Sequence, residues 1–215
     1  MKLSIAALIA VVGLASAAQA ATVTFSTSIA SAPTGWTNVV SLPQFDNGIG
    51  GTYDGLILTS VTITVSGTAT GNIAIESLDA GPAVVSYQIS ANLNFTGPGG
   101  ANGTSIPVAN GIFNATAFDG ISDFGGTSGA SFNGLSGTNS ANASPFVLFP
   151  YEGNGNINVN VVASGASGGS GAGNLLQQFS TAASAEVSVT YTYIPTPGAM
   201  ALMGMGGLLA ARRRR

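Results

Sequence analysis

The feature that most constrains this chain is a strict alternation of apolar and polar residues in several separate segments. Residues 61–65, for example, are Val-Thr-Ile-Thr-Val. A period of two is typical of a strand that buries one face and exposes the other. The clearest such segments are residues 61–65, 83–95, 157–161 and 187–193, and two weaker ones are 22–29 and 39–42.

Glycine-rich clusters separate these segments, as at residues 97–100 and 125–126. Short strands joined by such turns predict an all-β fold, an antiparallel β-sandwich with a jelly-roll-like arrangement as one version. A right-handed β-solenoid is the alternative, but the chain has no fixed repeat period. Residues 174–179 are the one stretch that fits a helical period, and the Gly/Ser/Ala run 165–173 is predicted to be a flexible loop.

The N-terminus has the pattern of a signal peptide. Lys2 precedes an apolar run, residues 3–14, and small residues follow up to Ala18-Gln19-Ala20. The run is too short to span a bilayer, and a small-x-small triplet is what a signal peptidase cleaves after. We therefore expect residues 1–20 to be a signal peptide whose cleavage is directed by Ala18 and Ala20.

The C-terminus combines prolines, an apolar run and a basic cluster. Two prolines within residues 194–198 end the preceding strand pattern, because proline removes a ladder donor. An apolar segment of roughly 14 residues follows, and as a helix it would reach about 21 Å, short of the roughly 30 Å hydrocarbon core. Four arginines, Arg212, Arg213, Arg214 and Arg215, end the chain. Such a segment suits a transient membrane stop with the arginines on the cytoplasmic side.

This three-part tail, residues 194–215, resembles the PEP-CTERM sorting signal of bacterial exosortase systems. The family motif is Pro-Glu-Pro, whereas this chain has Pro195, Thr196 and Pro197, followed by Gly198. The resemblance implies an exosortase-type processing protease as a partner. It also implies transient retention at the inner membrane before release to the cell surface or the extracellular space.

The segment between the two signals, residues 21–193, resembles the choice-of-anchor E domain. This family is defined by one exported domain joined to alternative C-terminal anchors, and the resemblance implies no particular activity. The matching motifs run in order along the chain: residues 42–46, 58–64, 76–79, 95–100, 118–126, 179–181 and 189–193.

Charge in this middle segment is entirely negative. It contains no Lys, Arg or His, while all eight carboxylates of the chain lie within it. Nucleic acid is excluded as a partner, because binding phosphates requires cationic side chains. The chain also has no cysteine, so disulfides and zinc-thiolate sites are excluded. Metal cations, cationic polymers and uncharged exopolysaccharides remain as partners.

The same composition limits catalysis. Without His, Cys or Lys in this segment, neither a Ser-His-Asp triad nor a Cys-His or Ser-Lys pair can form. A glycosidase that uses two carboxylates is the one enzyme class left, with Asp119 and Asp123 or Glu76 and Asp79 as the pair. Turn-capping is the simpler role for these acids, and Trp36 is the only tryptophan. No catalytic residue is predicted.

The sequence predicts no cofactor, and a bound calcium ion is the alternative. Asp119 and Asp123 lie in a glycine-containing loop, and oxygen ligands in such loops suit hard cations. Residues 46–48, Asp-Asn-Gly, are a second candidate. Neither has EF-hand spacing, and Asx turns explain both patterns without any further assumption.

Together these observations predict an exported, non-catalytic protein of the cell surface or a biofilm matrix, with a structural or a glycan- or cation-binding role. Two alternatives remain open. One is the carboxylate-dependent glycoside hydrolase. The other is a self-assembling matrix fibre, because strands with little charge and no lysine are prone to edge pairing.

Overall fold

The computed structural model describes residues 19–195, and within them the chain is built almost wholly of antiparallel strands. Ten strands and two single-turn 3₁₀ helices, η1 (Pro98–Gly100) and η2 (Phe149–Tyr151), make up the regular structure of this part. In residues 19–195 no helix is both long and apolar enough to cross a membrane. The prediction of an all-β fold is confirmed, and each of the six predicted strand segments lies in a strand.

Four long strands form the first sheet, here named sheet A. Their order across the sheet is β1 (Ala21–Pro33), β10 (Leu175–Pro195), β3 (Leu56–Ser77) and β7 (Gly129–Ala143). Sheet A is held together chiefly by the pairing of β10 with β3, which continues from Leu175↔Ser77 to Pro195↔Leu56.

The second sheet, sheet B, is centred on β4 (Ala83–Thr96). The first half of β4 pairs with β6 and β9, and the second half pairs with β5 and β8, which in turn pairs with β2. These strands are β2 (Trp36–Pro43), β5 (Asn102–Ser105), β6 (Val108–Ala115), β8 (Asn156–Gly165) and β9 (Gly168–Ser170).

The alternating side chains of the two sheets meet in two hydrophobic clusters. The larger cluster lies nearer the chain ends and contains Phe45, Ile63 and Tyr191. The smaller cluster contains Ile73, Tyr87 and their neighbours. Burial of these apolar faces is the main force that holds the sheets together.

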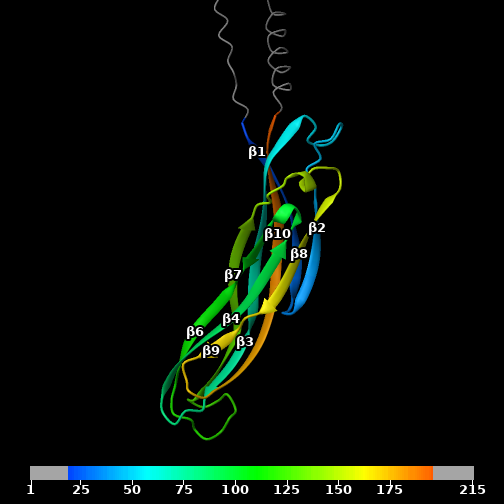
Figure 1. Ribbon diagram of the computed structural model, residues 1–215. Helices are drawn as coiled ribbons and strands as arrows, with labels where there is room; N and C mark the ends of the chain where they lie inside the picture. The colour runs from blue at the N-terminus through cyan, green and yellow to red at the C-terminus, as the bar shows by residue number, and fades with distance from the viewer. Residues whose placement is uncertain (1–18, 196–215) are drawn as a thin grey trace, which may run out of the picture.

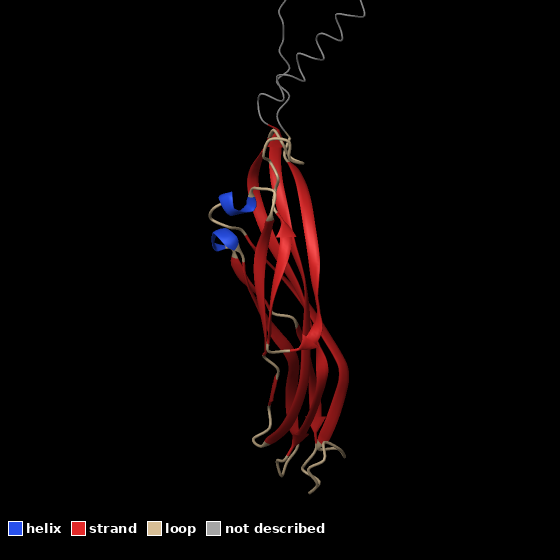
Figure 2. Cartoon of the chain, turned by 90° about the vertical axis from the view of Figure 1, so that its right-hand side faces the viewer, coloured by secondary structure: helices blue, strands red, loops and turns tan. Residues whose placement is uncertain are grey.

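Figures 1 and 2 show a long, narrow molecule in two layers. Strand β1 begins and β10 ends at one end of it, and the loop 116–128 lies at the opposite, distal end (Figure 1). Because β3 runs from Leu56, opposite Pro195, to Ser77, the smaller cluster lies in the distal half. Both 3₁₀ helices lie in the half that carries the chain ends (Figure 2).

Two local predictions were wrong. Residues 174–179 are not helical, because β10 begins at Leu175 and pairs with β3 from its first residue. Residues 165–173 are not one continuous loop, because Gly168–Ser170 form β9 and pair with β4. In both segments hydrogen bonding to a distant strand decides the conformation, which the local sequence pattern does not reveal.

Candidate functional site

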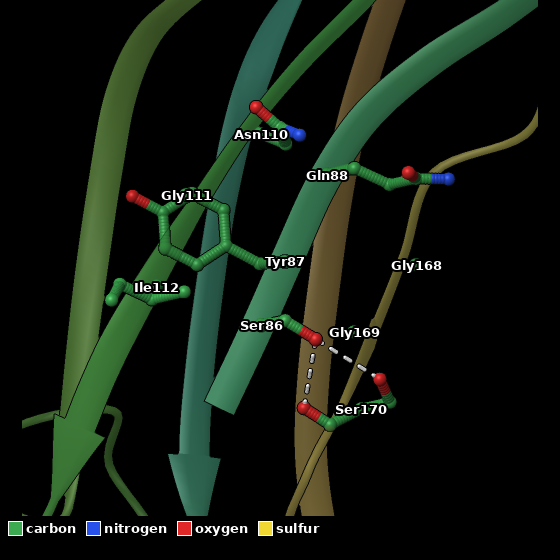
Figure 3. Close-up of a pocket in the computed structure, with 9 residues that line it drawn as sticks. All are labelled: Ser86, Tyr87, Gln88, Asn110, Gly111, Ile112, Gly168, Gly169 and Ser170. Carbon is green, nitrogen blue, oxygen red and sulfur yellow. Dashed lines mark hydrogen bonds between the residues drawn. The ribbon is translucent and has the colours of Figure 1, made fainter. Parts of the chain in front are cut away.

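An open groove of about 610 Å³ lies on the outer face of sheet B, in the distal half of the molecule (Figure 3). We name it the β4 groove, because β4 forms its floor between β6 and β9. Five side chains face the groove: Ser86, Gln88, Asn110, Ile112 and Ser170. The backbone of Gly168 also lines it.

The strand register places these residues on one face. Ser86 pairs with Ile112 on one side and with Ser170 on the other. Gln88 pairs with Asn110 and Gly168 in the same way. Since side chains alternate along a strand, two rows of outward residues cross the three strands. None of these side chains carries a charge.

The polar groups of the groove are only partly used within the protein. The Ser86 hydroxyl lies 3.1 Å from the Ser170 hydroxyl, and Gln88 Nε2 donates to the Ala166 carbonyl oxygen at 3.3 Å. The carboxamide of Asn110 makes no hydrogen bond to the rest of residues 19–195. The groove therefore offers donors and acceptors to a polar ligand that bears no charge.

The floor of the groove rests on a fixed aromatic pair. The Tyr87 side chain points into the core, where its ring stacks on Phe132 of β7 with centroids 4.3 Å apart. Gly111 pairs with Tyr87, and a Cβ there would meet the Tyr87 ring so closely that the ring would have to move. Gly168 differs, since a Cβ there would meet nothing within 4 Å. The β9 side of the groove is therefore open down to the backbone.

The calcium candidates Asp119 and Asp123 lie in the exposed distal loop. Asp119 Oδ1 accepts from the backbone nitrogen of Ile121 at 3.0 Å, and Asp123 Oδ1 accepts from that of Gly125 at 2.7 Å. Both are Asx turns. Within residues 19–195, no group of three or more His, Cys, Asp or Glu side chains is arranged to hold a metal ion. Calcium binding by these residues was the alternative to a protein without a cofactor, and these contacts do not test it.

The other carboxylate pair is tied into the fold. Glu76 is completely buried, and its Oε2 accepts from the backbone nitrogen of Phe124 at 2.8 Å. Asp79 accepts from the backbone nitrogens of Gly173 and Asn174, at 2.7 Å and 2.9 Å, and so joins two distal loops. Both side chains therefore already have positions and partners that stabilise the folded domain.

The predicted processing residues lie at or beyond the limits of the described structure. Ala20 is exposed just before β1, and Pro195 is the last residue of β10. Ala18, Thr196, Pro197 and Gly198 lie outside the described residues, as do Arg212, Arg213, Arg214 and Arg215.

Sequence reasoning missed the β4 groove. In the sequence, Ser86 and Gln88 are simply polar positions of a predicted strand. Ser170 lies in the segment that was predicted to be a loop. Ser86 and Ser170 are 84 residues apart in the chain. The single local signal was the lack of any charge in these segments.

Comparisons with known proteins add no family. No family model matches the chain, and no curated protein matches it. One solved structure, titled "Structure of infectious bursal disease virus Gt strain", shares 10% identity over 84% of this chain, with a TM-score of 0.12. The match covers 41% of that viral chain. A similarity this weak carries no argument about fold or function.

Proposed function

We propose that this chain is an exported, non-catalytic protein of the cell surface or extracellular matrix that binds a neutral polysaccharide in the β4 groove. The observation that carries the proposal is the uncharged, hydroxyl- and carboxamide-lined surface of that groove. Sugar hydroxyls both donate and accept hydrogen bonds, as do Ser86, Gln88, Asn110 and Ser170.

The strength of such binding follows from its chemistry. Each hydrogen bond between the protein and a sugar replaces hydrogen bonds to water, and its net contribution to binding is about 0.5–1.5 kcal/mol. A single sugar unit is therefore held weakly, whereas a polymer that lies along the open groove makes several such contacts at once. The exposed side chain of Ile112 adds an apolar contact for the carbon-bound face of a sugar ring.

Export and sorting are supported by the sequence of both ends and fit the placement of the groove. The signal-peptide pattern ends at residue 20, one residue before β1, and the PEP-CTERM-like tail starts where β10 ends. Both junctions lie at one end of the molecule, and β6 and β9, which flank the β4 groove, lie in the other half (Figure 1). A domain held at a surface through its tail would thus present the groove away from that surface.

We also infer that the two sheets form a jelly roll. The support is the strand order, β1-β10-β3-β7 in sheet A and β2-β8-β4-β5 in sheet B. If β5 with β6, and β8 with β9, each count as one strand, these orders become 1-8-3-6 and 2-7-4-5. Jelly rolls include lectin domains, so the topology is compatible with carbohydrate binding, although a fold alone assigns no function.

Against hydrolysis stands the use of the acids within the fold. Glu76 is inaccessible and hydrogen-bonded, and Asp119 and Asp123 each close a local turn. The β4 groove contains no carboxylate among its lining residues. Binding without turnover is therefore the function that we propose.

The test is affinity electrophoresis of the full chain in gels that contain dextran, galactomannan or hydroxyethylcellulose, with alginate as the anionic comparison. We expect retardation by at least one neutral polymer. Gly168→Leu adds a side chain at a groove position where a Cβ would meet nothing within 4 Å, and it should lower the affinity of the groove about tenfold, equivalent to about 1.4 kcal/mol. Gly81→Leu is the matched control, since its position is equally open but lies outside the groove. Equal retardation of both variants, or none of the wild type, would refute the proposal.

A further inference from the structure

A second polar depression lies on the outer face of sheet A, and we name it the β3 pocket. It measures about 180 Å³. The side chains that face it come from three adjacent strands: Asn72 and Ala74 of β3, Ser131 and Asn133 of β7, and Gln178 and Ser180 of β10.

A β-bulge shapes this pocket. The register of β3 with β7 shifts between Gly71 and Ile73, and Gly134 opposite the shift has φ of +67°. Asn72 Oδ1 accepts from the Gly134 backbone nitrogen at 2.9 Å, which fixes the Asn72 side chain at the pocket. Bulges commonly re-aim side chains in this way. Ala74, with its small side chain, leaves the middle of the pocket open.

Polar groups in the pocket are available to a ligand. Asn133 and Gln178 are exposed, and their carboxamides make no hydrogen bond to the rest of residues 19–195. Carboxamides and hydroxyls pair with sugar hydroxyls, whereas the absence of a charged side chain from the pocket lining gives no attraction to an ionic ligand. The chemistry matches that of the β4 groove.

On β3 and β7, the outer face of sheet A continues from the pocket toward the chain ends as rows of hydroxyl side chains. The register pairs Thr70 with Ser136 and Thr68 with Thr138, and the Ser66 and Ser140 hydroxyls lie 2.7 Å apart. Neighbouring rows are about 6.8 Å apart along the strands, and neighbours within a row are about 4.8 Å apart. An extended polymer that enters the pocket can therefore make repeated weak contacts along this face.

The pocket and the groove lie back to back. Tyr87 lies beneath the floor of the β4 groove, Phe132 lies beneath the β3 pocket, and the two rings stack on each other between the sheets. Packed sheets are about 10 Å apart. Because the two surfaces face opposite directions, one polymer chain cannot occupy both without wrapping around a sheet edge.

From this arrangement we infer that the β3 pocket is a second site for neutral polysaccharide, so that one molecule bridges two polysaccharide chains. The inference rests on the proposed function of the β4 groove and extends it from binding to cross-linking. A matrix protein with two opposed sites would join polymer strands into a network, because each molecule contributes one junction.

The test is a capture assay with the full chain. The neutral polymer that retards the protein is immobilised, the protein is bound and unbound protein is removed, and fluorescently labelled polymer is then added. The pocket variant is Asn133→Ala with Gln178→Ala, which removes two exposed carboxamides that have no partner within residues 19–195. The groove variant is Gly168→Leu, and Thr37→Val with Thr96→Val is the matched pair of exposed substitutions elsewhere on sheet B.

We expect wild type and the Thr37/Thr96 variant to capture labelled polymer. The groove variant and the pocket variant should each remain bound to the immobilised polymer in part, yet capture at least about tenfold less label per bound molecule. Bound wild-type protein that captures no label would overturn the inference and leave the proposed function intact. Undiminished capture by the pocket variant would overturn it too, because bridging would then come from self-association. Failure of wild type to bind any polymer would instead refute the proposed function.

Discussion

The Glu76 carboxylate accepts a hydrogen bond from the Phe124 backbone nitrogen at 2.8 Å, and this contact closes the distal end of the molecule. By strand alternation Glu76 shares the outer face of sheet A with Asn72 and Ala74, yet it is completely buried, because the loop 116–128 folds over it. Phe124 is the one non-glycine residue with a positive φ, 58°, in residues 19–195. The bond to Glu76 therefore helps hold a backbone conformation that is otherwise unfavourable.

Replacing Glu76 tests the strength of this closure. Glu76→Ala removes the acceptor of the Phe124 nitrogen and of the Ser128 hydroxyl, 3.4 Å away. We expect the free energy of unfolding to fall by about 1–3 kcal/mol, as for a buried polar group left without its partner. Urea denaturation, followed by circular dichroism, measures this change in the free energy of unfolding. Glu186→Gln, at an exposed acid, is the control and should change stability by no more than about 0.5 kcal/mol. A similar effect of both substitutions would contradict this account.

The bulge at the β3 pocket predicts a second, smaller effect. Gly134 has φ of +67°, and a Cβ there would meet nothing within 4 Å, so the cost of Gly134→Ala is conformational alone. We expect a loss of about 1–2 kcal/mol, the cost of left-handed backbone for an L-residue. Gly168→Ala has the same open space without a positive φ, and it should be neutral or stabilising by up to about 1 kcal/mol. A thermal melt of the two variants side by side would show the difference, and equal melting temperatures would rule it out.

Alkaline pH should destabilise the half of the molecule near the chain ends. Burial raises the pKa of Tyr151 from 10.0 to about 12, and its hydroxyl donates to the Pro98 carbonyl oxygen at 2.8 Å. Because the folded state holds this proton more tightly than the unfolded state, the contribution to stability is complete below pH 10 and is lost as the pH rises toward 12. Unfolding free energies between pH 8 and 12 should therefore fall. In Tyr151→Phe the free energy of unfolding at pH 8 should be lower than that of the wild type by about 1 kcal/mol, and it should fall less steeply as the pH rises. Parallel pH profiles of the two proteins would refute this assignment.

Calcium should leave the stability of the domain unchanged. Asp119 and Asp123 each accept a backbone N–H in their own turn, so one oxygen of each carboxylate is already engaged. A cation that binds only the folded state would add about 2.7 kcal/mol at a hundredfold excess over its dissociation constant. We expect no change in melting temperature between calcium and a chelator. An increase of several degrees, lost in Asp119→Asn with Asp123→Asn, would instead establish the calcium site.

The sequence predicts a strand well where one face of the strand is apolar, and it predicts strands less well where glycines interrupt the pattern. Val61, Ile63 and Val65 are predicted to be buried by their alternation, and all three are. The full length of β3 was not predicted, because it continues through Gly67 and Gly71, residues that usually weaken strands. Gly67 and Gly71 lie where a side chain would clash with Leu93 and with the Ser180 backbone, respectively, so close packing requires them.

The candidate sites were harder to predict than the fold. Each depends on register: Ser86 meets Ser170 and Asn72 meets Gly134 only because distant strands pair in one alignment. Register is set by the packing of buried faces over the whole sheet, which local patterns do not contain. The acids show the opposite case, since Asp119 and Asp123 form the Asx turns that their local sequence already suggested.

Salt provides the sharpest check on the kind of ligand. The β4 groove and the β3 pocket contain no ionisable side chain among the residues that face them, apart from the inward-pointing Tyr87 phenol. The described residues carry only negative charge among their acidic and basic side chains. Interactions between exposed charges are strongly screened when the Debye length shortens from about 10 Å at 0.1 M salt to about 3 Å at 1 M. We therefore expect the affinity for neutral polysaccharide, measured by titration, to change less than about twofold over this range, because hydrogen bonds and apolar contacts are not screened in this way. A steep loss with rising salt would mean that the acids recruit a cationic polymer, and the two neutral surfaces would then not be the binding sites.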